Sequence, residues 1–336
     1  MKKLDYDQFV IGECVGTGTV GAVYSVIDKE TGKTYALKLL SPGVGSDGLI
    51  VSRFEREIEI LSKLNHPNVV AFVGYGRHER QLFYVMEYLN SGTLADVLRN
   101  SGPLSWPEAA ECGRQLAIAL QHLHNNGVIH RDVKPGNVYL TDDGRLKLGD
   151  FGIARDTQAM RLTDTGLTVG TYAYMSPELV RGESAVTGKS DLYSLGCLLF
   201  EILVGKPPYP GSNFVEITEQ HLNAPPPSVR AAGIACPATF DKLIQSLLAK
   251  DPEARPFNAR AVQGVLGELT SDAYQPRPGE APSPTDRGAA SVMTAQAMFA
   301  RRIAKSRTNP EVSWLALGLI AGGITVLLAV AAWLNA

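Results

Sequence analysis

Two short motifs near the middle of the chain place three oxygen-bearing side chains at a restrictive spacing. His130-Arg131-Asp132 is followed, five residues after the aspartate, by Asn137, and Asp150-Phe151-Gly152 begins thirteen residues later. The first motif puts a carboxylate and a carboxamide on one short loop, and the second returns another carboxylate to the same place. Such oxygens are ligands of Mg²⁺, and the remaining carboxylate can orient a hydroxyl group. The spacing therefore predicts a site for phosphoryl transfer from a metal-bound nucleotide.

The bulk composition limits the other classes of function. The chain has 336 residues, of which 45% are hydrophobic, so it can form two lobes or domains with sizeable cores. Its formal net charge of −2 gives no global attraction to nucleic acid, and no basic stripe interleaved with aromatic residues supports such binding. The four cysteines are scattered without a CxxC pair, which argues against a metal or disulfide framework and fits a reducing compartment. The polar N-terminus lacks the apolar core of a signal peptide.

An uncharged segment near the C-terminus has the length of a membrane span. Trp314 to Leu334 is 21 residues long with a tryptophan at each end, where interfacial rings belong. The alternative is a buried core helix, but such a helix is rarely this long and apolar on every face. Basic residues lie only before the segment, so the positive-inside bias places the preceding chain in the cytoplasm. Because two residues follow the segment, we expect no sensor domain beyond it.

Gly318 and Gly322 form a GxxxG pattern inside this segment. The pattern can let two membrane helices approach closely and pair. Glycine is also frequent in membrane helices generally, so pairing and a simple span both stay open.

The pattern upstream of residue 105 is mainly that of strands, and the pattern downstream is mainly that of helices. A helix is expected over 51–64, because Phe54, Ile58, Leu61 and Leu64 share one face. Strands are expected over 9–15, 22–28, 34–40, 69–74 and 82–88, with short strand-like segments at 138–140 and 146–148. The chain is therefore expected to fold as a small β-rich lobe and a larger helical lobe, with the hinge near 87–92.

The β-rich part holds a glycine-rich turn and a lysine inside a strand. The run from Gly16 to Gly21 fits GxGxxG, a spacing that dinucleotide-binding folds also use, but those open a helix after the third glycine. Here the chain continues as a strand, which makes a flap whose backbone can approach phosphates. Lys38 follows in an apolar strand, either as an edge residue reaching water or as a phosphate ligand. Glu57, which lies within the apolar arc of the next helix, is its natural partner.

This ordered set of motifs resembles the eukaryotic-like protein Ser/Thr kinases, in particular their bacterial membrane-anchored members, over roughly Tyr6 to Leu269. The matching positions are Gly16, Gly18, Gly21, Val23, Lys38, Glu57, His130, Arg131, Asp132, Asn137, Asp150-Phe151-Gly152, Ser176-Pro177-Glu178, Asp191 and Arg255. Two departures are small: Ser176 replaces an alanine, and Gly136 replaces a larger residue. Neither removes a catalytic group, so the resemblance implies an α+β bilobal kinase fold with an intact site.

The resemblance also implies a role for each site residue. Asp132 would act as the base toward a substrate hydroxyl, Lys134 would steady the transferred phosphoryl group and mark Ser/Thr specificity, and Lys38 with Glu57 would hold the phosphates. Asn137 and Asp150 would hold Mg²⁺. The ATP-binding positions would be Gly16, Thr17, Gly18, Thr19, Gly21, Val23, Ala36, Lys38, Met86, Glu87, Leu89 and Tyr139. Tyr139 stands where the family usually has an aliphatic floor under adenine, so its ring is expected to narrow the pocket, and Arg255 would pair with Glu178.

Three regions follow from these patterns. A kinase domain is expected over 6–270, a flexible Pro-rich and basic juxtamembrane linker over 271–312 with a short basic helix near 292–305, and a transmembrane helix over 313–334. We expect a single-pass protein of the cell membrane with its kinase domain in the cytoplasm, in contact with lipid, acting on protein substrates and activated by autophosphorylation at Thr163 and Thr165. The alternative is a membrane-anchored scaffold of kinase fold with little turnover.

Overall fold

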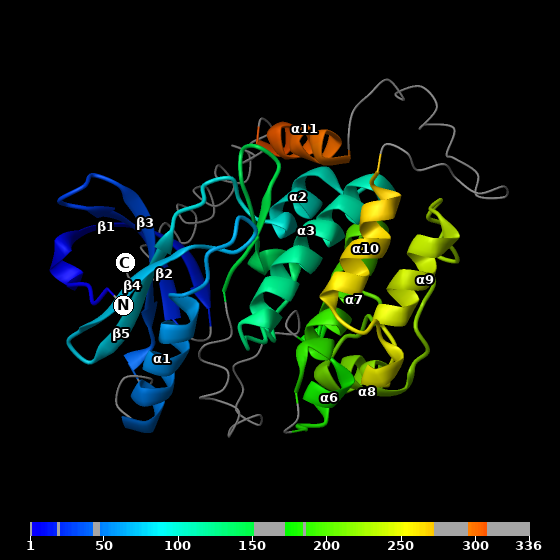
Figure 1. Cartoon of the computed structure of the whole chain (residues 1–336), viewed down its shortest axis with the longest axis horizontal. Helices are drawn as coiled ribbons and strands as arrows, with labels where there is room; N and C mark the ends of the chain where they lie inside the picture. Colours follow the sequence, from blue (N-terminus) through cyan, green and yellow to red (C-terminus); the bar gives the residue numbers. More distant parts are fainter. Residues whose placement is uncertain are drawn as a thin grey trace, which may run out of the picture.

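The computed structural model describes residues 2–18, 21–42, 48–150, 172–183, 186–271 and 295–307. They form two lobes joined through residues 87–93 (Figure 1). The smaller lobe is a five-stranded antiparallel sheet with one helix, and the larger lobe is mainly helical. The expected bilobal α+β architecture is therefore confirmed.

The sheet of the smaller lobe has the order β1-β2-β3-β5-β4. Its strands are β1 (Phe9–Gly18), β2 (Gly21–Asp28), β3 (Thr34–Leu40), β4 (Phe72–His78) and β5 (Gln81–Glu87), and a short 3₁₀ turn, η1 (Tyr6–Gln8), precedes them. The predicted strand over 69–74 is displaced to β4, because Val69 and Val70 instead pair with Leu148 of the other lobe: the Val70 N–H donates to the Leu148 carbonyl oxygen at 2.9 Å. This pairing links the lobes behind the hinge.

Helix α1 (Gly48–Leu61) covers one face of the sheet. Phe54 and Ile58 are buried there, as their spacing on one helix face predicts. The helix begins before the predicted residue 51 and ends at Leu61 rather than at Leu64. Leu64 is nevertheless buried, so the apolar pattern identified a core position that lies just beyond the helix.

The larger lobe is built around two long helices, α3 (Trp106–Asn125) and α7 (Gly188–Val204), whose contact forms the centre of its core. The remaining elements are α2 (Leu94–Ser101), η3 (Pro135–Asn137), β6 (Val138–Leu140), β7 (Leu146–Leu148), α6 (Pro177–Val180), α8 (Phe214–Asn223), α9 (Ala238–Leu247), η5 (Pro252–Ala254) and α10 (Ala259–Leu269). The two short strands β6 and β7 agree with the predicted segments and form an antiparallel pair that faces the smaller lobe.

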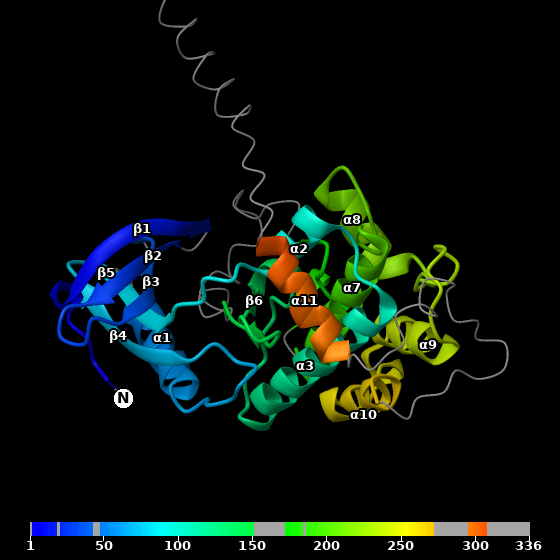
Figure 2. The same ribbon diagram turned by 90° about the horizontal axis from the view of Figure 1, so that it is seen from above.

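A last helix, α11 (Ala295–Arg307), lies across α2 and α3 on the outside of the larger lobe (Figures 1 and 2). Phe299 and Ile303 are fully buried beneath it. Arg302 donates to the carbonyl oxygens of Ser101, Gly102 and Pro103 at 2.7, 2.9 and 2.5 Å. The expected basic helix near 292–305 therefore exists, and it packs on the larger lobe.

No helix among the described residues is both long and apolar enough to cross a membrane. The predicted span over 313–334, with Gly318 and Gly322, lies outside the described residues.

Candidate active site

One face of the small sheet forms the roof of the cleft between the lobes. In the antiparallel register, Lys38 pairs with Val23 on one side and with Tyr84 on the other, and Ala36 pairs with Met86. Directly opposed residues and those two positions apart share a face. Val23, Ala36, Lys38, Tyr84 and Met86 therefore line one surface, as the kinase resemblance implies for four of them. Tyr84 was not among the predicted site residues. Its position opposite Lys38, on the same face of the neighbouring strand, was the signal that could have identified it.

The glycine-rich turn joins β1 and β2 at the edge of this roof. At Gly21 a Cβ atom would lie 2.1 Å from the Leu39 carbonyl oxygen, so no other residue fits that position. At Gly16 a Cβ atom would meet nothing within 4 Å, and at Gly18 it would meet only the Gly21 carbonyl oxygen at 4.0 Å. These two glycines leave open space in which a ligand can approach the backbone. Thr17 is described, whereas Thr19 lies outside the described residues.

The loop over residues 130–137 brings Asp132, Lys134 and Asn137 together. The Asn137 side-chain amide donates to the Asp132 carboxylate at 2.9 Å and to its carbonyl oxygen at 2.8 Å. The Lys134 ammonium lies 3.0 Å from the same carboxylate oxygen. The Asp132 carboxylate is thus held in one orientation by an amide and a cation, and it remains partly exposed to the cleft.

Buried hydrogen bonds hold this loop from below. The fully buried Asp191 of α7 accepts from the backbone N–H groups of His130 and Arg131 at 2.9 and 2.8 Å. Arg131 has a left-handed backbone with φ of 62°, a strained conformation that such contacts maintain. Burial lowers the pKa of His130 despite the nearby carboxylates, so its ring is neutral. The ring Nε2 lies 2.9 Å from the Gly149 carbonyl oxygen, to which it donates a hydrogen bond. The loop is thereby tied to the residue that precedes Asp150.

Asp150 faces Lys38 across the cleft. The Lys38 ammonium lies 2.5 Å from Asp150 Oδ1, and the Tyr139 hydroxyl donates to Asp150 Oδ2 at 3.1 Å. Burial alone would lower the pKa of Lys38, but Tyr84 and the Asp150 carboxylate outweigh it and hold that pKa above its ordinary value. Burial and then the carboxylate raise the pKa of the Tyr139 phenol. Both groups therefore keep their protons and act as donors at neutral pH.

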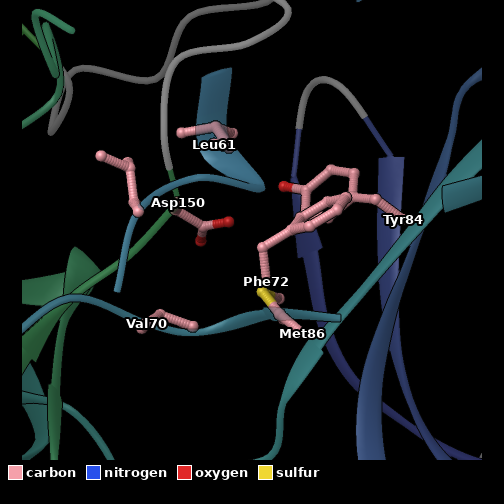
Figure 3. A pocket seen from close by; sticks show the side chains of 7 residues that line it. Leu61, Val70, Phe72, Tyr84, Met86 and Asp150 are labelled. Carbon is pink, nitrogen blue, oxygen red and sulfur yellow. The ribbon is translucent and has the colours of Figure 1, made fainter. Parts of the chain in front are cut away.

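A pocket lies behind this ion pair (Figure 3). Its lining residues are Leu61, Leu64, Val70, Phe72, Tyr84, Met86 and Asp150. Burial raises the pKa of Tyr84 to about 12, so the ring beside Lys38 is neutral. Met86 lines this space and directly precedes Glu87 at the end of β5, and its place at the back of an adenine pocket stays a prediction.

The side chain of Glu87 connects the hinge to the neighbouring backbone and to the larger lobe. Glu87 Oε1 accepts from the Ala71 N–H at 2.6 Å and lies 2.8 Å from the Lys147 ammonium of β7. The second of these contacts joins the Glu87 carboxylate to β7 of the larger lobe. Leu89 follows and packs against the core. Backbone contacts of Glu87 and Leu89 with a base stay a prediction.

The predicted pair of Glu178 and Arg255 is present as a buried, bidentate ion pair. The two nitrogen–oxygen distances are 2.7 and 2.9 Å. Ser190 also donates to Glu178. Burial raises the pKa of Glu178, but the bonds from Arg255 and Ser190 lower it to about 2. The pair fixes the segment that follows the catalytic cleft to the core of the larger lobe.

The residues expected to hold a metal ion suit a hard cation. Among the described residues, no three histidine, cysteine, aspartate or glutamate side chains form a metal cluster. Asp150 and Asn137 instead offer a carboxylate and an amide oxygen, since the Asn137 amide nitrogen is engaged by Asp132. The Gly149 N–H donates to the Asn137 carbonyl oxygen at 3.0 Å, which holds Asp150 next to that loop.

Several predicted site residues lie outside the described part of the chain. They are the Glu57 side chain, Phe151, Gly152, Thr163 and Thr165. The expected pairing of Lys38 with Glu57 therefore stays a prediction, and among the described residues Lys38 forms an ion pair with Asp150.

Comparison with known proteins shows which family has this arrangement of residues. Residues 9–265 match the protein kinase domain family. Serine/threonine-protein kinase PknB of Mycobacterium tuberculosis is 35% identical over 90% of this chain and 48% of its own length, and PknB of Mycolicibacterium smegmatis is 32% identical over 97% and 54%. The chain thus spans about half the length of these curated relatives. The crystal structure of Rad53 1-466 in complex with AMP-PNP has a TM-score of 0.64 and 30% identity, covering 77% of this chain and 64% of that one.

Proposed function

Because this chain belongs to the protein kinase family, we propose that it is a protein serine/threonine kinase that transfers the γ-phosphate of ATP to Ser and Thr hydroxyl groups of proteins. The single observation that carries the proposal is the meeting of Asp132, Lys134 and Asn137 on one loop opposite the ion pair of Lys38 and Asp150. The relatives' names, and the nucleotide analogue in the Rad53 complex, support the same chemistry.

Each residue has a part that follows from its contacts. Asp132, held by Asn137 and Lys134, orients the substrate hydroxyl and accepts its proton. Lys38 stays charged and can bind phosphate oxygens from the roof. Asn137 and Asp150 would hold Mg²⁺, which supplies charge neutralisation to the phosphates when bound. Catalysis of this kind is mostly positioning and electrostatic stabilisation, which suits a cleft with charged groups on both lobes.

The test is transfer of labelled phosphate from ATP to a basic test protein. Asp132→Asn and Asp150→Ala should each lower the rate by at least ~10²-fold, because they remove the base and a metal ligand. Circular dichroism melting serves as the control that both variants remain folded. Near-wild-type transfer by folded Asp150→Ala protein would contradict the assignment. Nucleotide binding by the wild type without any transfer would favour the alternative of a kinase-fold scaffold.

Membrane anchoring by residues 313–334 is part of the same proposal. Its support is the length and charge pattern of that segment, with Arg301, Arg302, Lys305 and Arg307 on the side expected to face the cytoplasm. Recovery of the full chain in the soluble fraction of lysed cells would exclude it. Gly322→Leu should weaken pairing of the segment without preventing insertion, with a dimerisation reporter as the readout.

Activation by phosphorylation of Thr163 and Thr165 is proposed from their position between Asp150 and Ser176. A phosphate there adds negative charge that Arg131, next to the catalytic aspartate, can bind. Mass spectrometry of active protein should find phosphate at one or both threonines. Active protein that carries no phosphate between residues 153 and 176 would exclude this form of activation.

A further inference from the structure

The Tyr139 hydroxyl makes a contact that packing of the side chain beneath an adenine ring would not require. It donates to Asp150 Oδ2 at 3.1 Å, while Lys38 occupies Asp150 Oδ1 at 2.5 Å. The two donors come from different lobes, one from β6 and one from β3. An aliphatic side chain would cover the base equally well, so the hydroxyl needs a separate explanation.

The backbone around Tyr139 accommodates this contact closely. Tyr139 pairs with Lys147 across β6 and β7, and β7 leads through Gly149 into Asp150. A Cβ atom at Gly149 would lie 2.6 Å from Val70 Cγ2 and 3.1 Å from Tyr139 Cε2, so the glycine makes room chiefly for Val70 and lets the ring lie close to the backbone. Asp150 itself has a left-handed backbone with φ of 55°, a costly conformation at a non-glycine residue. Tyr139, Gly149 and Asp150 therefore pack closely against one another.

We propose that Tyr139 is a positioning residue for the metal: its hydroxyl holds the Asp150 carboxylate in the orientation that binds Mg²⁺ with the nucleotide. The inference rests on the proposed kinase function. Each carboxylate oxygen has two lone pairs, so accepting one hydrogen bond leaves the other pair for a cation. Hydrogen-bonded partners of metal ligands fix ligand orientation, and losing one typically weakens metal binding by ~10–100-fold.

The experiment separates the hydroxyl from the ring. Binding of a fluorescent ADP analogue to the full chain in detergent is measured in EDTA and across a Mg²⁺ titration, and the ratio of the two dissociation constants gives the metal enhancement. Tyr139→Phe should leave the affinity in EDTA within about twofold and lower the enhancement about tenfold. Tyr139→Leu also lacks the hydroxyl and serves as the second variant. It should lower the enhancement equally, and any change in its affinity in EDTA measures what the ring contributes to packing against the base.

Three results would overturn the inference. An unchanged enhancement in Tyr139→Phe would show that the hydroxyl does not act on the metal. An equal loss of affinity with and without Mg²⁺ would assign Tyr139 to packing alone, and a larger enhancement would mean that the hydroxyl competes with the cation. Failure of the wild type to bind nucleotide at all would instead count against the proposed kinase function.

Discussion

Replacing Phe299 with alanine should release α11 from the larger lobe while the kinase domain stays folded. Among the described side chains of this helix, Phe299 and Ile303 are fully buried, and Arg302 adds hydrogen bonds to the C-terminal end of α2 and the glycine after it. Arg302 is partly buried and reaches carbonyl groups at a helix C-terminus, where a cation is favourable. The burial and hydrogen bonds described for α11 thus centre on residues 299–303.

The size of the effect follows from the burial. Covering Phe299 and Ile303 is worth ~1.5–3 kcal/mol each, and ordering the helix opposes this gain. A buried Phe→Ala substitution costs ~3–5 kcal/mol when the site cannot relax. Because this cost is at least as large as the net docking energy, Phe299→Ala alone should abolish docking. Adding Ile303→Ala should then cause no further loss.

Hydrogen exchange of the full chain in detergent measures the docking directly. A docking energy of ~2–3 kcal/mol slows exchange in α11 by ~30–150-fold, since ~1.4 kcal/mol is a factor of ten. Phe299→Ala should bring the α11 amides to the rate of a free peptide and leave α3 and α7 protected. Arg301→Ala, at an exposed position of the same helix, is the matched control and should change nothing.

Rapid exchange of α11 in the wild type, or full protection in Phe299→Ala, would refute this reasoning.

The same packing affects the stability of a shortened protein. A shortened protein that ends near Thr270 should still catalyse transfer, but it uncovers the surface beneath Phe299 and Ile303. It should therefore melt at a lower temperature than one that ends at Arg307.

Two further predictions concern the segment after the cleft. The Ser176 hydroxyl is buried and has no hydrogen-bond partner within the described chain, so Ser176→Ala should be neutral or stabilising by up to ~1 kcal/mol in urea unfolding. The pKa of Glu178 falls from an ordinary 4.5 to about 2, so its ion pair contributes ~3 kcal/mol above pH ~4.5 and loses this as the pH falls toward 2. Glu178→Gln should flatten that part of the stability–pH curve, and an unchanged acid slope would contradict it.

The sequence predicted most of the fold because its local patterns and its packing agree. The apolar arc predicted for α1 identified core-facing side chains correctly, since Phe54, Ile58, Leu61 and Leu64 are all buried. Boundaries were less accurate where a tertiary contact intervened. Val69 and Val70 have strand-like character but pair with Leu148 of the other lobe, so β4 begins after them.

The candidate site was predicted mainly through motif spacing, which determines which groups meet but not which hydrogen bonds they form. Asp132, Asn137 and Lys134 meet as expected. The bond from Tyr139 to Asp150 depends on the close approach of a ring to Gly149, and no local pattern encodes that distance. The docking of α11 did have a signal, since Phe299 and Ile303 stand four residues apart on a basic helix.

Docking of α11 also determines how far the kinase domain can move from a membrane, if residues 313–334 span it. A free linker over 271–312 would reach ~35 Å on average, whereas a docked α11 leaves residues 308–312, which extend over at most ~18 Å. Cys14 is exposed on β1 and the other three cysteines are buried, so a dye can be placed on the smaller lobe alone. In vesicles with an acceptor on the lipid headgroups, Phe299→Ala should lower energy transfer from this dye, because the released linker lets the lobes move outward. Equal transfer in the variant and the wild type would show that α11 does not hold the domain near the membrane.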